Sequence, residues 1–173
     1  MSGFLLLKKR FIAYDGFNRA DSSPLGCDDL GNTWTDATGV TKVISNMMGY
    51  ASLGSGSKVL SYIDCFHKNV KITDKLAVNT GPELGAVFTI FRYVDLKNYF
   101  MVKTTATSFR LEKYIGGILT VVGESELVTP AKYNDIVEIT LMDGNILVSI
   151  NNVIILSVVD EDLIESTKFG VGL

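Results

Sequence analysis

The chain has 173 residues, of which 47% are apolar and 20% charged, which suits one globular domain with a sizeable core. Its net charge of -3 at pH 7 offers no basic field to a phosphate backbone, which argues against nucleic acid as the main partner. The apolar runs are far shorter than the roughly 20 residues that span a bilayer, so we expect a soluble protein without membrane insertion.

The first 14 residues are interpreted as an N-terminal strand or docking segment before a single domain over residues 15–173. An apolar run at residues 4–7 precedes a basic cluster at residues 8–10, whereas a signal peptide carries its basic residues before a longer apolar run. We therefore expect no secretion signal. The apolar run could be an edge or core strand, or it could bind a partner or a further copy of the chain.

The longest irregular stretch, residues 15–41, is rich in Gly, Asp, Asn, Ser and Thr, which favour turns. A loop of this length in a compact domain is usually packed for a purpose or functional. Its Trp34, the only tryptophan, either anchors the loop on the core or offers a flat ring to a sugar. Arg19 and Asp21 are expected to form a local ion pair and an Asx turn that hold the loop's shape.

Two cysteines and one histidine could carry chemistry. Cys27, in the long loop, and Cys65, in a predicted strand, could form a disulfide, but two unpaired thiols are the simpler interpretation because spacing does not show proximity. His67 has no second histidine or catalytic partner in the pattern, so we expect a surface role rather than acid–base chemistry.

Alternation of apolar and polar residues marks the strands that follow. After a short apolar piece at residues 42–48 and a Gly/Ser-rich connection at 49–57, we expect a central strand over 59–66 and a strand with one wet face over 70–78. Further strands are expected over residues 86–94, 99–107, 109–115 and 118–122, the last two joined by a tight turn at Gly116 and Gly117.

The strongest signal lies in residues 133–159, where three alternating strands are joined by turns at Asp143-Gly144-Asn145 and Asn151-Asn152. These residue types tolerate the positive φ that tight hairpin turns require. A final strand is expected over residues 168–173, with a single helical turn at most at 124–132 or 160–167. The chain is therefore predicted to be all-β, a two-sheet antiparallel β-sandwich of the jelly-roll type.

Residues 14–26, Tyr-Asp-Gly-Phe-Asn-Arg-Ala-Asp-Ser-Ser-Pro-Leu-Gly, with Trp34 shortly after, resemble the opening of concanavalin A-like (lectin/glucanase, laminin-G-like) jelly-roll modules of bacteriophage tail, fibre and baseplate proteins. Residues 85–99, 139–156 and the closing Phe-Gly-Val-Gly-Leu at 169–173 resemble later segments of the same modules. The resemblance implies a concanavalin A-like fold that commonly binds carbohydrate and often sits on a virion. One departure is the absence of the modules' second tryptophan near Gly39.

Sugar recognition needs flat aromatic rings and a few placed polar groups. The candidates lie at two neighbouring hairpins and in the long loop, and are Arg92, Tyr93, Asn98, Tyr99, Lys113, Tyr114 and Trp34. The alternative is that they are ordinary half-buried sheet residues and a loop anchor.

Two acidic groups could bind Ca²⁺, which prefers carboxylate and carbonyl oxygens. One is Asp160, Asp162 and Glu165; the other is Asp28 and Asp29 with Asp15 or Asp21. Solvated loop charge is the alternative for both. The first group approaches the E-x-D-x-x-E carboxylate set of the fold's glucanases, but it differs at the first carboxylate and falls in a predicted loop, so we predict no catalytic site.

These observations predict a bacteriophage virion protein whose lectin-like jelly roll binds host-surface carbohydrate. It would be made in the host cytoplasm and located on the virion, with host-surface glycan, other virion proteins and further copies of itself as partners. The alternative is a purely structural decoration, fibre or adaptor protein that acts through protein–protein contacts. A glycoside hydrolase is disfavoured.

Overall fold

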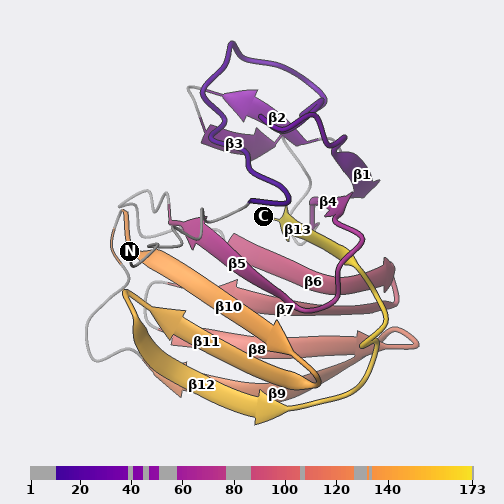
Figure 1. The fold of residues 1–173 in the computed structure, drawn as a ribbon, viewed down its shortest axis with the longest axis vertical. Helices are drawn as coiled ribbons and strands as arrows, with labels where there is room; N and C mark the ends of the chain where they lie inside the picture. The colour runs from indigo at the N-terminus through magenta and orange to yellow at the C-terminus, as the bar shows by residue number, and fades with distance from the viewer. Residues whose placement is uncertain are drawn as a thin grey trace, which may run out of the picture.

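The computed structural model describes residues 11–38, 41–44, 47–50, 58–76, 87–105, 108–126, 132 and 134–172. These residues form two antiparallel sheets that face each other, and a separate two-stranded hairpin (Figure 1). No helix occurs among them, and hence none that could cross a membrane. The predicted all-β, two-sheet sandwich is confirmed.

The larger sheet has seven strands. Their order across the sheet is β1 (Thr35–Thr38), β4 (Leu60–Asp64), β13 (Lys168–Gly172), β6 (Val87–Asp95), β7 (Asn98–Thr104), β8 (Ser108–Ile115) and β9 (Ile118–Glu126). The C-terminal strand β13 is thus inserted between β4 and β6 and pairs antiparallel with both. Strands far apart in the sequence therefore become neighbours at the centre of this sheet.

The smaller sheet has four strands, in the order β12 (Val153–Val159), β11 (Asn145–Ile150), β10 (Ile136–Met142) and β5 (Val70–Lys75). Its β10–β11–β12 meander confirms the three strands expected over residues 133–159. Asp143, Asn151 and Asn152 have positive φ at the two predicted turns. The separate hairpin consists of β2 (Thr41–Ile44) and β3 (Met47–Tyr50) and lies above the sandwich in Figure 1.

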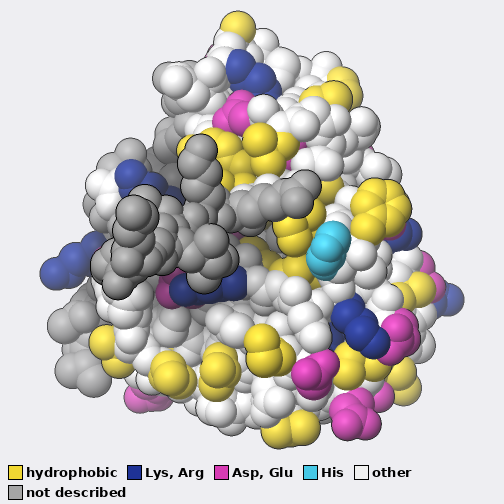
Figure 2. Space-filling model, in the orientation of Figure 1, with side chains coloured by type: hydrophobic (Ala, Val, Ile, Leu, Met, Phe, Trp, Pro, Cys, Tyr) yellow, Lys and Arg dark blue, Asp and Glu magenta, His cyan; other side chains and the backbone are white. Residues whose placement is uncertain are grey.

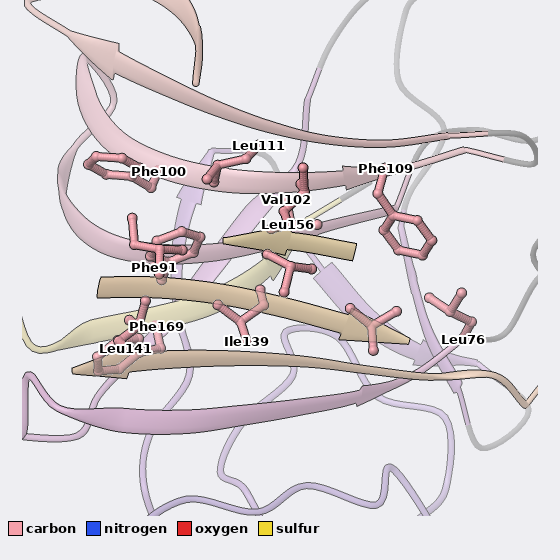
Figure 3. Packing of buried hydrophobic residues seen from close by; sticks show 13 residues of the cluster. Leu76, Phe91, Phe100, Val102, Phe109, Leu111, Ile139, Leu141, Leu156 and Phe169 are labelled. Carbon is pink, nitrogen blue, oxygen red and sulfur yellow. The ribbon is translucent and has the colours of Figure 1, made fainter. Parts of the chain in front are cut away.

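The hydrophobic core lies between the two sheets, where buried side chains from both sheets point toward one another (Figure 3). In β10, Val137, Ile139 and Leu141 are buried, whereas Glu138 and Thr140 between them are only half-buried. The period of two seen in the sequence therefore separates a core face from an outer face, as expected for a half-buried strand.

The structure differs from the predicted elements in a few places. The strand expected over residues 59–66 ends at Asp64, and Phe66 lies in the following loop. Residues 11–14, the described part of the expected N-terminal strand, are irregular, and residues 160–167 form turns without a helix. Residues 1–10, 51–57 and 127–131 lie outside the described residues, and so do the predictions made for them.

Candidate functional site

The outer face of the seven-stranded sheet carries a row of four tyrosines from four different strands. Ring centroids are 4.7 Å apart for Tyr62 and Tyr93, 6.1 Å for Tyr93 and Tyr99, and 4.8 Å for Tyr99 and Tyr114. Tyr93 and Tyr99 are only 5% and 3% exposed, whereas Tyr62 and Tyr114 at the two ends are half-buried. Because the rings stack on one another, the two central tyrosines offer little free ring face to a ligand.

Glycines of β13 allow this row to form. Gly170 pairs with Tyr62 on one side and Ile90 on the other, so any side chain there would lie on the outer face between β4 and β6. A Cβ atom at Gly170 would overlap the Ser61 carbonyl oxygen and lie 2.8 Å from the Tyr62 Cα atom. The missing side chain lets the Tyr62 ring reach Tyr93 across β13. The closing Gly-x-Gly pattern is therefore a packing requirement.

Arg92 does not point to this face. It has φ 48° at a register shift between β6 and β7, and its side chain is buried. Its guanidinium group donates hydrogen bonds to the carbonyl oxygens of Asp160 and Asp162, at 2.6 and 3.1 Å. Burial lowers the pKa of Arg92, and the nearby carboxylates of Asp160 and Asp162 oppose this shift. Arg92 thus holds the loop that joins the two sheets.

Lys113 fastens the same loop. Its Nζ atom lies 2.6 Å from an Asp160 carboxylate oxygen and 2.8 Å from one of Asp162. Hydrogen bonds to these two carboxylates raise the pKa of Lys113, although burial opposes the shift. Glu165, the third predicted calcium ligand, instead pairs with Lys68 at 2.6 Å. Among the described residues no three His, Cys, Asp or Glu side chains converge on a metal position.

Asn98 links two hairpin turns. Its side-chain nitrogen donates to Asp95, and its side-chain oxygen accepts the Gly116 backbone N–H at 2.9 Å. Of the candidate sugar-binding residues, the structure therefore brings Tyr93, Tyr99 and Tyr114 together. It gives Arg92, Asn98 and Lys113 structural contacts instead.

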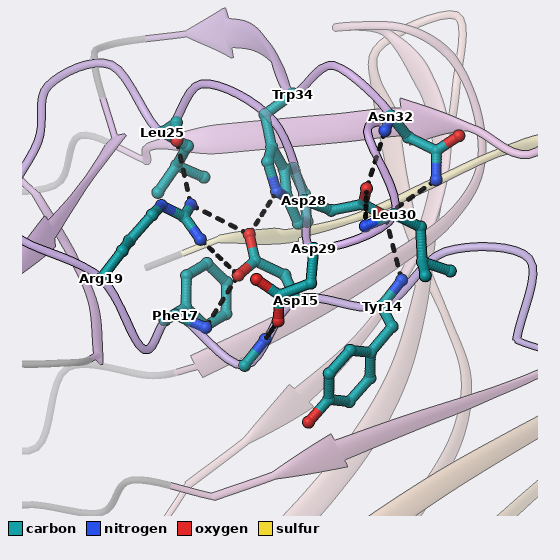
Figure 4. A network of polar contacts seen from close by, with 11 residues as sticks. Tyr14, Asp15, Phe17, Arg19, Leu25, Asp28, Asp29, Leu30, Asn32 and Trp34 are labelled. Atoms are coloured by element: carbon teal, nitrogen blue, oxygen red, sulfur yellow. Dashed lines mark hydrogen bonds and ion pairs between the residues drawn. The ribbon is translucent and has the colours of Figure 1, made fainter.

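The opening motif folds around Asp15 (Figure 4). The Asp15 carboxylate accepts hydrogen bonds from the Phe17 backbone N–H at 2.7 Å, the Arg19 guanidinium at 2.6 Å and the Trp34 indole N–H at 2.8 Å. Arg19 also donates to the Leu25 carbonyl oxygen. Trp34 is thus a loop anchor, as one of its two interpretations held. The local ion pair expected for Arg19 forms with Asp15, four residues earlier, where the side chain can reach it.

Asp28 is the second centre of the loop (Figure 4). Its buried carboxylate accepts the backbone N–H groups of Tyr14, Leu30 and Asn32, and the Asn32 side-chain amide. Burial alone raises the pKa of Asp28, but these hydrogen bonds outweigh burial and lower it below its usual value. Asp29 accepts the Gly16 N–H at 2.9 Å. These carboxylates satisfy loop donors and do not form a cluster of oxygens for Ca²⁺. Cys27 and Cys65 are both unpaired, as the simpler interpretation expected.

The tyrosine row continues onto strands β8 and β9 through residues that sequence reasoning missed. The register places Leu119 opposite Tyr114, Val121 opposite Glu112, and Glu124 opposite Arg110. Exposure increases toward the free edge of the sheet, where Leu119 and Val121 are 46% and 47% exposed. The tight turn at Gly116 and Gly117 contained the signal for the pairs of Leu119 and Val121, because turn geometry sets the register of a hairpin. The pair of Arg110 and Glu124 depends also on a register shift between Leu111 and Glu112, which the turn does not predict.

Polar groups surround this apolar strip. Arg110 lies 2.9 Å from a Glu124 carboxylate oxygen and 3.6 Å from one of Glu112. Lys58 donates to the Tyr114 hydroxyl at 2.7 Å, and its Nζ atom is 4.4 Å from that ring's centroid. Burial, followed by the neighbouring Tyr114 and Glu112, raises the pKa of Tyr99 far above its usual value. Tyr99 is therefore a neutral hydrogen-bonding group at physiological pH. An apolar strip with a few oriented polar groups can contact both the C–H groups and the hydroxyls of a small polar molecule.

Comparison with known proteins gives a fold and no family. No family model matches the chain, and no curated protein matches its sequence. The solved carbohydrate-binding module CBM66 from Bacillus subtilis is similar in structure, with a TM-score of 0.66 and 16% identity over 81% of this chain and 86% of that chain. The apo Crh5 transglycosylase is similar with a TM-score of 0.58 and 12% identity over 93% of this chain and 70% of that chain. Neither likeness bears on the predicted virion context. Both likenesses support the β-sandwich fold of this chain.

Proposed function

We propose that this chain is a carbohydrate-binding β-sandwich without catalytic activity, and that glycan binds over β8 and β9 on the outer face of the seven-stranded sheet. The observation that carries the proposal is the exposed strip of Leu119 and Val121 beside Tyr114, bordered by the ion pair of Arg110 and Glu124. The likeness to a carbohydrate-binding module supports the same function.

The chemistry of this strip suits a sugar ring. The C–H groups of a pyranose would pack on Leu119, Val121 and the edge of Tyr114, while its hydroxyls would bond to Arg110 and Glu124. Such a shallow site gives modest affinity per domain, and several copies bound to one surface would raise the apparent affinity by avidity.

The absence of catalysis is part of the proposal. Glycoside hydrolysis requires two carboxyl groups on opposite sides of the scissile bond. Asp160 and Asp162 are both engaged by Lys113, and Glu112 and Glu124 share Arg110, which supports binding rather than turnover. Release of reducing ends from any bound polysaccharide would overturn this part.

A polysaccharide retention experiment tests the site. The purified chain is mixed with insoluble cellulose, chitin, β-1,3-glucan and whole bacterial cell walls, and the retained fraction is measured. Val121→Asp places a charge on the strip and should abolish retention. Val153→Asp is the matched control, because Val153 is also an exposed valine on an edge strand, 63% exposed on β12, and should be retained like the wild type. Equal retention of both variants, or no retention of the wild type, would refute the proposed site.

We also propose that the chain is a virion protein that adheres to host-surface glycan, on the basis of the opening motif's resemblance to bacteriophage modules. The motif's contacts are internal to its loop, so the resemblance concerns origin rather than ligand contact. Antibodies to the chain should label intact virus particles from its source. Particles that lack the chain would contradict the proposal.

A structural role through protein–protein contacts is the second candidate. The observation that favours it is β12, a sheet edge without a charged residue, on which Val153, Ile154 and Val159 are exposed. Uncharged apolar edges readily pair with other strands. Light scattering of the purified chain across a concentration series would show self-association, which Ile154→Lys should suppress.

A further inference from the structure

The loop between β4 and β5 presents an aromatic ring to solvent. Phe66 is 81% exposed, more than any other aromatic side chain in the described part of the chain. Its φ of 57° lies in the left-handed region, which large side chains rarely adopt. The sequence pattern placed Phe66 in a strand, so its position follows from the tertiary structure alone.

Hydrogen bonds on both sides of Phe66 fix this conformation. An Asp64 carboxylate oxygen accepts the Phe66 N–H at 3.0 Å and the Thr167 hydroxyl at 2.6 Å, and the Cys65 N–H donates to the Thr167 carbonyl oxygen. Farther along the loop, Asn69 exchanges two hydrogen bonds with Asp143. The backbone at Phe66 is therefore held in a defined conformation, although the ring contributes little to the core. Strained residues that bury nothing are a reason to look for a function.

The residues that follow Phe66 in the loop carry polar groups that suit a neutral sugar. His67 is exposed, and its Nδ1 atom lies 2.8 Å from the Cys65 carbonyl oxygen, so Nε2 remains for a ligand. The ion pair of Lys68 and Glu165 is also exposed, and its charges compensate each other. In Figure 2 the single histidine lies on the surface beside hydrophobic side chains. A flat ring can pack against a sugar ring, while imidazole, ammonium and carboxylate groups of the same loop region can bond its hydroxyls.

We propose that Phe66 and His67 form a second glycan-binding site, specific for an uncharged sugar. This inference takes its ligand class from the proposed function but uses none of the same residues. Strands β13, β6, β7 and β8 separate β4 from β9, the strand of Leu119 and Val121, which corresponds to about 24 Å at the usual interstrand spacing. A polysaccharide chain could contact both sites, and simultaneous contact would strengthen binding.

The single histidine makes the test direct, because its imidazole C–H signals in a proton NMR spectrum report this site alone. Soluble oligosaccharides of cellulose, chitin and β-1,3-glucan are added to the wild type and to Val121→Asp. One of them should shift the His67 signals in both proteins. Phe66→Ala should weaken that binding by about 10-fold. Phe11→Ala is the matched control, because Phe11 is also an exposed phenylalanine, and it should bind like the wild type.

The outcomes separate this inference from the proposed function. Polysaccharide retention that Val121→Asp abolishes, with His67 signals that no sugar moves, would overturn the second site and leave the first intact. Shifts that persist in Val121→Asp and weaken in Phe66→Ala support it. Phe66→Gly, which adopts positive φ without strain, should weaken binding as much as Phe66→Ala, and normal binding by Phe66→Gly would also overturn the inference.

Discussion

Replacing Gly170 by alanine should strongly destabilise this protein. The added Cβ atom would overlap the Ser61 carbonyl oxygen and lie 2.8 and 2.9 Å from the Tyr62 Cα and the Ser61 carbonyl carbon, all of which are backbone atoms of β4. A flexible side chain could move aside, but paired backbone cannot. Relief therefore requires β13 to move away from β4, which weakens the ladder between them and separates Tyr62 from Tyr93.

The expected cost follows from these contacts. Overpacking typically costs about 1–3 kcal/mol, and each weakened ladder hydrogen bond about 1 kcal/mol more. Alanine also lowers the conformational entropy of the unfolded chain, which stabilises the folded state by about 0.4–1 kcal/mol. The free energy of unfolding should thus fall by about 3–4 kcal/mol. For a chain of this size that corresponds to a loss of about 6–16 °C in Tm.

Urea unfolding followed by far-UV circular dichroism and by the fluorescence of Trp34 measures the change. Gly123→Ala is the matched control, since Gly123 also lies within a strand of the same sheet. Its Cβ atom would meet the side chains of Leu156 and Val158 at 3.4 and 3.7 Å, which are ordinary contacts, so its stability should change by less than about 1 kcal/mol. If Gly170→Ala unfolds like Gly123→Ala, then β13 is not packed against β4 as described, and the reasoning fails.

Three further predictions concern buried polar groups. Asp28→Ala leaves four loop donors without their acceptor and should cost about 2–4 kcal/mol in urea unfolding. Because the folded-state pKa of Asp28 is lowered, its ionisation stabilises the fold above pH 3.8, the ordinary pKa, and this stabilisation is lost as the pH falls through the folded-state pKa. The stability of Asp28→Asn should not show this decrease at low pH. The half-buried Asp74 accepts a hydrogen bond from Thr89 between the sheets, and burial raises its pKa despite that bond. The stabilising contribution of protonated Asp74 is therefore present below pH 3.8 and is lost as the pH rises through the folded-state pKa. Asp74→Asn should be more stable than the wild type at pH 7, and the difference in stability should shrink toward pH 3. Burial, with Asp64 and Asp28 adding to it, raises the pKa of the Cys65 thiol to about 11, so a thiol reagent at pH 8 should label the exposed Cys27 rapidly and Cys65 only on unfolding.

For each of these three predictions, one experimental result would contradict it. Unchanged stability of Asp28→Ala would mean that the loop does not depend on that carboxylate. A stability difference for Asp74→Asn that does not change with pH would show that Asp74 titrates normally. Equal labelling rates for the two cysteines would show that Cys65 is open to solvent.

Local patterns in the sequence determined the strands and hairpins. The alternation over residues 136–159 and the turn residues Asp143, Gly144, Asn151 and Asn152 were sufficient for the β10–β11–β12 meander. Turn type and strand period depend only on neighbouring residues, so they can be read without the fold. The same holds for the hairpin at Gly116 and Gly117, which sets Tyr114 opposite Leu119.

Only the tertiary structure decided which of these elements meet. Insertion of β13 between β4 and β6 brings Tyr62 to Tyr93, a contact for which no local pattern exists. Arg92 and Lys113 carry polar groups that could bind a sugar. The loop with Asp160 and Asp162 folds over them instead, and both side chains hold that loop in place. The physical reason is the same in each case. A polar or aromatic side chain takes its role from whatever long-range packing places beside it, whereas a strand or a turn takes its shape from its own residues.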